Sequence, residues 1–577
     1  MRTVKTSLLT LVFMLSTVVA CKKSFLKILP TGSLDETKLT SQAGLEGSLI
    51  GTYSMLLGRS GDFYDGGDNW FWGNVMAAES YKGTNAGDQV QTNEIFTYNP
   101  QPTNGTVTEK YTRSYEGIAR ANNTLKLLAK ADPTVSDEVK TRITAETKFL
   151  RGHFYFELKR LYNNTPYIDE TWDGVSKVAN DKDLWPMIEA DLKFAMDNLP
   201  ATQADAGRAN KYAAEAYLAK VYLYEKKYSD AKPLFDDVIA NGKTAKGDKY
   251  GLLDKYTDLF NPRNDNNKES VFAIQAAAGT GSINNANPDM VLNFPYSGNG
   301  DVPAGCCGFD QPSFDLANSF RTVAGLPILD GTYNSPANEL KTDQGLVLAD
   351  PFTPDAGTVD PRLDYTVGRR GLPYLDWGPH KGAAWIRDQT YGGPYAPKKF
   401  VWPKADESSF VDHSSWTPGY IALNYDIIRF ADVLLMAAET EVELGNLETA
   451  RGYVNQVRAR AANAADFITD AGGNPAANYV ISQYTTTWTV QATARDAVRM
   501  ERKLELGQEG MHFYDIVRWG IADTEIAAAI AITNKHLGAT SCLNGAKFTK
   551  GKNELLPIPQ GEIDLLGSDV LKQNPGY

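Results

Sequence analysis

The sequence has few cysteines and few histidines, and it lacks the short motifs of the common enzyme classes. Four cysteines in 577 residues are too few for a disulfide framework. No HExxH pair, GxSxG elbow, Walker loop or dinucleotide fingerprint is present. The five histidines show no metal-ligand spacing: His153, His380, His413, His512 and His536. We therefore predict no metal site, and no motif marks a catalytic residue or a cofactor. This does not exclude a hydrolase, because the 70 acidic residues always supply the two carboxylates that a glycosidase needs.

Long hydrophobic runs are also missing, apart from one near the amino terminus. The run Leu8–Ala20 follows Arg2 and Lys5 and is shorter than the about 20 residues that span a bilayer. A basic start, a short apolar centre and a small residue before the break are typical of an export signal. Cys21 comes next, so we predict a lipoprotein signal peptide over 1–20, a lipidated Cys21 and a tether over 21–41. The alternative is an ordinary secretory signal followed by a chance cysteine.

Positive charge is in deficit. The formal net charge of −12 argues against a nucleic-acid partner and against binding to anionic membrane surfaces. With Cys21 lipidated, three cysteines remain, which allows at most one bridge. The adjacent Cys306 and Cys307 can bond to each other, or either can bond to Cys542, and the sequence leaves these pairings open.

Helical periodicity is strongest between Tyr425 and Ala461. Apolar residues step by three and four along two segments: Ile428, Ala431, Leu435, Ala438 and Val442, then Ala450, Val454, Val457 and Ala461. Gly445 is suited to end the first helix in a left-handed turn, and Asn446 to cap the second. Two helices joined by so short a turn pack antiparallel, as in a tetratricopeptide-like hairpin that needs neighbouring helices.

Further helical segments occupy most of the remaining chain. They are expected over Gln42–Leu57, Thr112–Ala131, Asp137–Tyr162, Trp185–Leu199, Ala213–Ala240 and Arg495–Trp519. In Ala213–Ala240 the residues Leu218, Ala219, Tyr222, Ala231 and Phe235 fit tetratricopeptide positions. Ser270–Ala276 is a plausible strand, and Gly279–Trp416 is loop-rich. We predict a mainly α fold, a stack of tetratricopeptide-like helix pairs with a loop-rich, minor-β segment on one side. No linker separates 42–265 from 266–577, which we expect to pack as one unit.

Two loops carry large aromatic residues beside carboxylates and amides. Trp70 and Trp72 follow Asp68 and Asn69 in the early loop, and the later loop offers Tyr296, Phe309 and Asp310. Flat rings cover the apolar face of a sugar, while planar amides and carboxylates pair with its hydroxyls. These seven residues are the candidate glycan site. The alternative is that the aromatics pack the loops onto the helices. A calcium site at Asp62, Asp65, Asp68 and Asn69 is a weaker alternative, because the spacing does not fit an EF-hand.

Charged residues recur within the helical segments near the carboxyl end. They are Arg429, Asp432, Glu439, Glu501, Arg502, Glu505 and Arg518. Buried charges in packed helices are normally paired, so we predict that these residues pair with one another and are not catalytic.

Several fragments, in this order behind the export signal, resemble the SusD/RagB family of outer-membrane lipoproteins along essentially the whole chain. They are Cys21–Leu26 with Pro30, Ala145–Leu158, Arg429–Glu439, Glu501–Gly520, Pro557–Pro559 and Gln573–Tyr577. The resemblance implies four tetratricopeptide-like helix pairs, with the irregular segments gathered on one side. It also implies a binding protein that is not an enzyme and needs no cofactor.

The resemblance further implies a function at the cell surface. Members of the family capture glycans, or in some branches peptides, and cap a SusC-like TonB-dependent transporter as its lid. We therefore expect a lipid-anchored outer-membrane protein, although Lys22 and Lys23 stand where displayed members often carry acidic residues. The alternatives are a peptide-binding RagB-like lipoprotein, a surface glycoside hydrolase and a scaffold that binds only protein.

Overall fold

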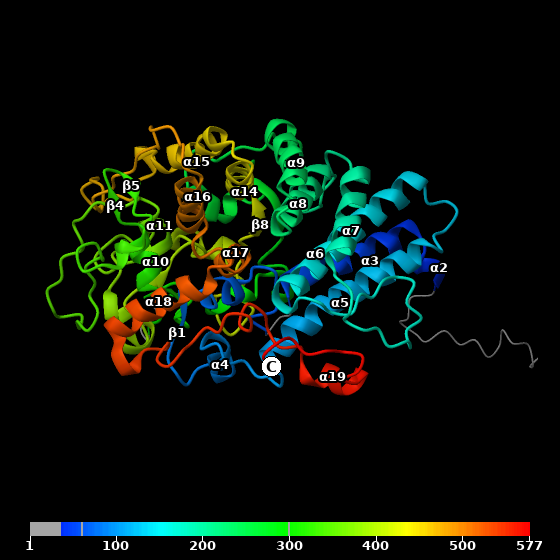
Figure 1. The fold of residues 1–577 in the computed structure, drawn as a ribbon, viewed down its shortest axis with the longest axis horizontal. Coiled ribbons are helices and arrows are strands. Elements are labelled where there is room, and N and C mark those ends of the chain that lie inside the picture. Colours follow the sequence, from blue (N-terminus) through cyan, green and yellow to red (C-terminus); the bar gives the residue numbers. More distant parts are fainter. Residues whose placement is uncertain (1–35, 59–61, 298–300) are drawn as a thin grey trace, which may run out of the picture.

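Helices dominate the structure, and most of them stand side by side in pairs (Figure 1). The computed structural model describes residues 36–58, 62–297 and 301–577. The predicted signal peptide, the lipidated Cys21 and most of the tether lie outside these residues. No helix of the described chain is both long enough and apolar enough to cross a membrane.

The amino-terminal part is a row of antiparallel helices. After α2 (Glu36–Leu39) come α3 (Gln42–Tyr53), α4 (Asn93–Phe96), α5 (Gly105–Leu128), α6 (Asp137–Tyr162), α7 (Trp185–Asn198), α8 (Lys211–Tyr224) and α9 (Tyr228–Asn241). Consecutive helices from α5 to α9 pack on one another. The side chains of Asn104 and Ser136 accept hydrogen bonds from the first turns of α5 and α6, so both helices begin at capping residues.

The carboxyl-terminal part continues the stack. Its helices are α14 (Phe430–Glu443), α15 (Leu447–Ala461), α16 (Gln491–Leu506), α17 (His512–Trp519), α18 (Ala522–Leu537) and α19 (Gln560–Leu566). Helix α14 packs against α15, α16 and α9, and so joins the two halves of the chain. Most of the buried apolar side chains form one large cluster that includes residues of both halves, and Tyr256, Leu259 and Tyr365 form a second, small one. The predicted stack of tetratricopeptide-like helix pairs is confirmed.

The hairpin at 425–461 differs from the prediction at two points. Residues Tyr425–Arg429 form strand β8, because this β-branched stretch pairs with β2 (Ser270–Ile274) and is largely buried there. Ile428 therefore does not belong to the helix face. Gly445 adopts the expected left-handed conformation with φ 82°. Asn446 does not cap α15 with its side chain, which donates instead to Glu441.

Short elements build the loop-rich part. The strand pairs are β1 (Ser80–Gly83) with β3 (Phe309–Pro312), β4 (Thr322–Val323) with β5 (Leu326–Pro327), and β6 (Val367–Gly368) with β7 (Ala396–Pro397), all antiparallel. The short helices are η2 (Trp70–Val75), η7 (Asp289–Leu292), α10 (Phe314–Ser319), α11 (Leu363–Thr366), α12 (Gln389–Gly392), η10 (Lys404–Asp406) and α13 (Glu407–Phe410). The β1–β3 pair brings the early aromatic loop against the later one.

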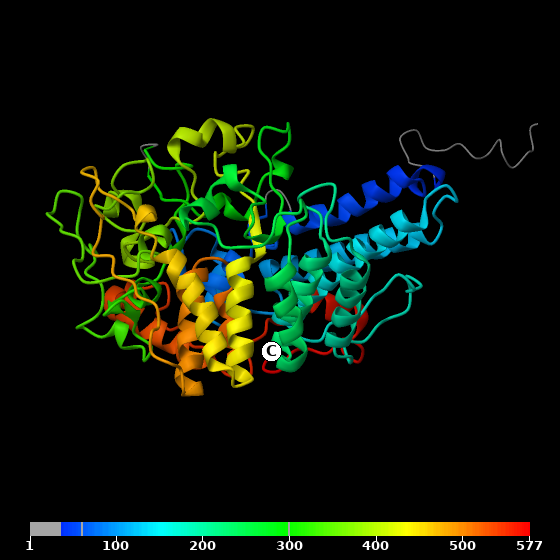
Figure 2. The ribbon, with the colours of Figure 1, turned by 90° about the horizontal axis from the view of Figure 1, so that it is seen from above.

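The two kinds of structure lie on opposite faces. Figure 2 shows the helix pairs α8–α9 and α14–α15, with α16, extending toward the lower edge of the view. The segment that contains η10 and α13 lies at the upper edge. The helical stack is therefore a platform, and part of the loop-rich segment covers the side of the molecule opposite the helix pairs.

The charged residues of the carboxyl-terminal helices are paired in the interior. Arg429 bonds to Glu505, Asp432 to Arg502 and Glu439 to Arg518, with all six side chains buried or nearly so. Glu501 finds its partners outside the predicted set, in Arg362 and Arg458. The prediction of structural ion pairs is confirmed for these residues.

The cysteine pairing that the sequence left open is resolved. Cys306 and Cys307 are bonded to each other, and Cys542 is a free, buried thiol.

Candidate functional site

The two tryptophans of the early loop point into the protein. Trp70 and Trp72 are 1% and 0% exposed. The indole nitrogen of Trp70 donates to the carbonyl oxygen of Phe63 at 2.8 Å, and that of Trp72 donates to the carbonyl oxygen of Tyr64 at 2.6 Å. Both polar edges are therefore satisfied by the loop's own backbone, and the rings pack this loop onto the body of the protein.

The later loop meets these residues in the interior. Phe309 is fully buried, and its ring lies edge-on to Trp70 with centroids 6.3 Å apart. Asp310 accepts a hydrogen bond from the side-chain amide of Asn74 at 3.2 Å. Burial raises the pKa of the Asp310 carboxyl well above its usual value. The structure thus brings Trp70, Phe309 and Asp310 together as a buried joint between the two loops.

The predicted polar residues Asp68 and Asn69 are buried in the same joint. Asn69 donates to Glu157 at 3.0 Å and accepts from the hydroxyl of Tyr514 at 3.2 Å. Asp68 interacts electrostatically with Asp289 of η7. Burial raises the pKa of Asp68 to about 6, and burial together with the charge of Asp68 raises the pKa of Asp289 well above its usual value.

The carboxylates of the early loop are not arranged around a common point. Asp65 lies 3.5 Å from the guanidinium of Arg113, whereas Asp68 faces Asp289. Within residues 36–58, 62–297 and 301–577, no group of three or more histidine, cysteine, aspartate or glutamate side chains is placed to hold a metal ion.

Among the seven candidates, Tyr296 differs from the rest because its side chain remains partly exposed. The guanidinium of Arg387 lies over its ring, 5.1 Å from the centroid. The backbone N–H of Tyr296 donates to the carbonyl oxygen of Trp385 at 3.0 Å. Arg387 also bonds to Asp88 at 2.5 Å and to the hydroxyl of Thr84 at 2.8 Å, so it is fixed from the other side. Tyr296 is therefore held in place at the surface.

A polar rim adjoins this tyrosine. Asp301 accepts from Lys381 at 2.5 Å and from the hydroxyl of Ser297 at 2.5 Å, and the indole nitrogen of Trp385 lies 3.5 Å away. The hydrogen bond from Lys381 is the main reason why the pKa of Asp301 falls to about 2. The carboxylate stays ionised at neutral pH. Lys381 and Arg387 are exposed and have further donors available to a ligand.

The disulfide turn and an exposed tryptophan extend the loop-rich surface. Cys306 is half-buried, and the carbonyl oxygen of Ala304 beside it accepts from the hydroxyl of Thr417 at 3.4 Å. The preceding Trp416 is 63% exposed. Sequence reasoning missed Trp416, Arg387, Asp301 and Lys381. The position of Trp416 between two serines and a Thr-Pro-Gly turn could have indicated an exposed ring. The sequence around Arg387, Asp301 and Lys381 gives no comparable indication of a surface site.

The arrangement is suited to a ring-shaped polar ligand. Tyr296 supplies part of a flat face, and the neighbouring ammonium, guanidinium and carboxylate groups supply donors and acceptors beside it. Aromatic side chains lose little conformational entropy when they bind.

Family comparisons match most of the chain. Residues 268–577 match the SusD family, and residues 61–223 match a family described as starch-binding associating with outer membrane. SusD-like protein P25 of Formosa agariphila is 27% identical over 536 residues, which cover 88% of this chain and 89% of that protein.

Solved structures share the fold. A laminarin-binding SusD-like protein is 24% identical, with a TM-score of 0.62 over 93% of this chain and 99% of that one. Surface glycan-binding protein A from Bacteroides thetaiotaomicron, in complex with laminarihexaose, is 19% identical, with a TM-score of 0.63 over 93% and 100%. At these identities the likeness establishes the architecture alone.

Proposed function

Since this chain belongs to the SusD family, we propose that it is a non-catalytic protein that binds oligosaccharides or polysaccharides at the cell surface. Two proteins of the same fold are described as laminarin-binding and as complexed with laminarihexaose, which supports a glycan as the ligand class. The observation that carries the proposal is the partly exposed ring of Tyr296, held by Arg387 and bordered by the Asp301–Lys381 pair.

In this proposal the sugar stacks against Tyr296, and its hydroxyls bond to the charged rim. Trp416 provides a second exposed ring on the same loop-rich segment. The buried candidates have a supporting role, because they hold the two loops together and so fix the surface on which Tyr296 lies. They are Trp70, Trp72, Asn69, Asp68, Phe309 and Asp310. A rigid surface loses less entropy on binding.

The cellular setting forms the second part of the proposal. The export signal and Cys21 support a lipid anchor, and the family description supports association with the outer membrane. Captured glycan would then pass to a SusC-like TonB-dependent transporter, for which this protein acts as the lid. Capture raises the local concentration at the transporter mouth, and closure commits the bound glycan to uptake.

The test compares the effects on glycan binding of replacing two aromatic residues of the loop-rich segment and one of the helical part. Glycan binding is measured by isothermal titration or affinity electrophoresis against a panel of polysaccharides that includes laminarin. Tyr296→Ala and Trp416→Ala should each weaken binding, whereas Trp172→Ala, which removes a 37% exposed tryptophan in the helical part, should not. Unchanged binding in both loop variants would reject the site. Release of reducing ends during incubation would reject the non-catalytic assignment.

A further inference from the structure

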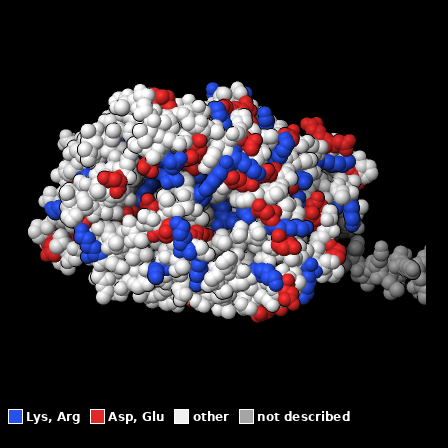
Figure 3. Space-filling model, in the orientation of Figure 1, with Lys and Arg blue, Asp and Glu red and all other residues white. Residues whose placement is uncertain are grey.

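A basic hollow lies in the middle of the face that carries the helix pairs. Figure 3 shows Lys and Arg side chains gathered there. The hollow has a volume of about 280 Å³, and Lys226, Arg495, Arg499, Arg518, Glu439 and Glu443 line it. Because the whole protein carries a net charge of −12, a local excess of cations at this place is unusual.

The two glutamates of the hollow are already bound. Glu439 accepts from Arg518 at 2.8 Å and from the indole nitrogen of Trp519 at 3.0 Å. Glu443 accepts two hydrogen bonds from Arg495, at 2.6 and 2.9 Å. Each carboxylate thus neutralises one of the guanidiniums that line the hollow.

Arg499 is the cation that remains. Within the part of the chain that the structure describes, its side chain forms no ion pair, and its Nε is buried without a hydrogen-bond acceptor. Burial lowers the pKa of Arg499 below its usual value. The charges of Glu439 and Asp496 oppose this effect, and those of Arg495 and Arg518 add to it. The side chain of Lys226, exposed at the rim, likewise has no acidic partner among the described residues. A partly buried guanidinium that forms no direct ion pair costs free energy, so an anion from outside the chain is a suitable complement for it.

The guanidinium of Arg499 is held in one position. It lies 4.9 Å from the centre of the Trp519 ring, and Arg518 lies 5.0 Å from the same centre. Stacking fixes the plane of a guanidinium and leaves its N–H groups free at the edge, the geometry that binds a carboxylate through two parallel hydrogen bonds. Since two guanidiniums cover Trp519, this ring is poorly placed to stack on a sugar.

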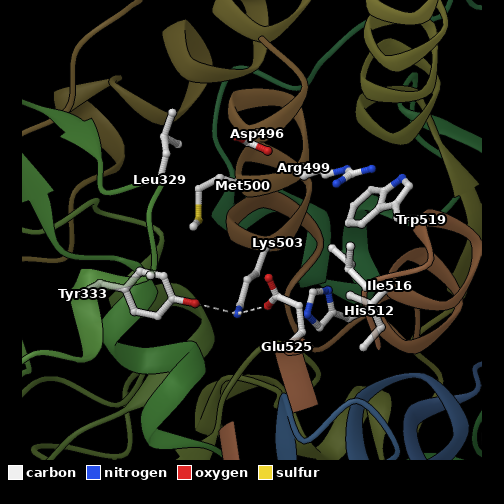
Figure 4. A pocket seen from close by; sticks show the side chains of 12 residues that line it. Leu329, Tyr333, Asp496, Arg499, Met500, Lys503, His512, Ile516, Trp519 and Glu525 are labelled. Atoms are coloured by element: carbon white, nitrogen blue, oxygen red, sulfur yellow. Dashed lines mark hydrogen bonds and ion pairs between the residues drawn. The ribbon is translucent and has the colours of Figure 1, made fainter. Parts of the chain in front are cut away.

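The neighbouring cavity provides a contrast. Figure 4 shows Arg499 and Trp519 at one side of a smaller space and Lys503 across from them. The ammonium of Lys503 bonds to Asp315 at 2.6 Å and to the hydroxyl of Tyr333 at 3.2 Å, with Glu525 at 3.7 Å. The chain itself therefore supplies the ion-pair and hydrogen-bond partners of this buried ammonium. Arg499 lines both cavities and has no ion-pair partner among the described residues.

We propose that the hollow docks an acidic side chain of a partner protein, with its carboxylate on Arg499 and Lys226. A polypeptide is the suitable partner because the hollow offers positive charge without an open ring. Its lining residues include members of α14 and α16, and Figure 2 shows these helices extending away from η10 and α13 of the loop-rich segment. The docking of a partner is independent of glycan binding at Tyr296, so either can fail alone.

The test uses full-length protein in detergent and fluorescein-labelled hexaglutamate, with hexaglutamine as the neutral control. Fluorescence anisotropy should detect binding of hexaglutamate alone, weakened by added salt. Arg499→Gln should reduce the affinity at least tenfold. Arg499→Lys keeps the charge but loses the paired hydrogen bonds, and should reduce the affinity about threefold. The matched control is Arg451→Gln on α15, whose arginine is paired with Glu448 and should not affect binding.

Three outcomes would overturn the proposal. They are equal binding of the two peptides, unchanged affinity in Arg499→Gln, and stronger binding of oligogalacturonate than of hexaglutamate. A structural role for Arg499 would lower the melting temperature when it is replaced, whereas a role in binding an anion predicts that Arg499→Gln, without the anion, melts at or above the wild-type temperature. Tyr296→Ala should bind hexaglutamate normally, which separates this inference from the glycan proposal.

Discussion

Nη1 of Arg362 lies 2.7 Å from Oε1 of Glu501, and neither side chain is exposed to solvent. The other oxygen of Glu501 accepts from Arg458 at 2.8 Å. One carboxylate of α16 thus joins an arginine of α15 to an arginine that begins α11. Glu501 thus fastens the loop-rich segment to the helical stack, which is a structural role of the kind that the sequence predicts for it.

Glu501→Ala is expected to lower the free energy of unfolding by about 3–5 kcal/mol, because it removes the carboxylate bonded to buried Arg458 and one of three carboxylates bonded to buried Arg362. Urea denaturation measures the change. The control Glu448→Ala removes an exposed partner of Arg451 and should cost about 0–1 kcal/mol. Glycan preference should be the same in both variants. An altered preference with unchanged stability would contradict the structural role.

Trp72→Ala should lower the free energy of unfolding by about 3–5 kcal/mol, since it empties a fully buried site and removes a hydrogen bond to Tyr64. Thermal or urea unfolding tests this. Trp172→Ala is the matched control, because that ring is partly exposed and should cost about 0.5 kcal/mol or less. If Trp72→Ala unfolds like the wild type but loses glycan binding, the early loop contacts ligand directly.

Asp289→Asn should change how stability depends on pH. In the folded protein the pKa values of Asp289 and Asp68 are raised above the ordinary 3.8, so the stabilising contribution of this pair is complete below pH 3.8. It is lost as the pH rises through the folded values, at about 1.4 kcal/mol per unit of pKa shift. Chemical unfolding between pH 4 and 7 should show the wild type losing stability relative to Asp289→Asn as the pH rises. A constant difference would show that the pKa of Asp289 is not raised in the folded protein.

Thiol labelling should locate the disulfide. Burial raises the pKa of the Cys542 thiol to about 12, so the folded protein should resist alkylation at pH 8. After denaturation without reductant, iodoacetamide should label Cys542 and leave Cys306 and Cys307 unlabelled. Reduction should open all three to labelling, and peptide mass spectrometry identifies the positions. Label on Cys306 or Cys307 before reduction would point to a different pairing.

The helical stack could be predicted because its signals are local. Helix α6 begins and ends at the predicted residues, since a serine cap and a regular apolar period mark it. Strand β8 was missed because Ile428 falls into register with the following helix, and only its partner β2, far back in the chain, makes it a strand.

The site was harder to predict for the same reason. Trp70 meets Phe309, and Asn74 meets Asp310, across more than two hundred residues of sequence. Composition identifies aromatic loops, but whether a ring points outward depends on such distant contacts. Tyr296 and Trp72 therefore looked equivalent in sequence, and only one of them is partly open to solvent.

The ladder between β2 and β8 places Ile274 directly beside Tyr425. The loop-rich segment 275–424 is therefore an insertion whose two ends join the helical stack at neighbouring residues. In evolution, an insertion of this kind can gain, lose or exchange residues while the paired strands at its two ends keep their positions. Relatives that share the same helices are then free to diverge in what they recognise.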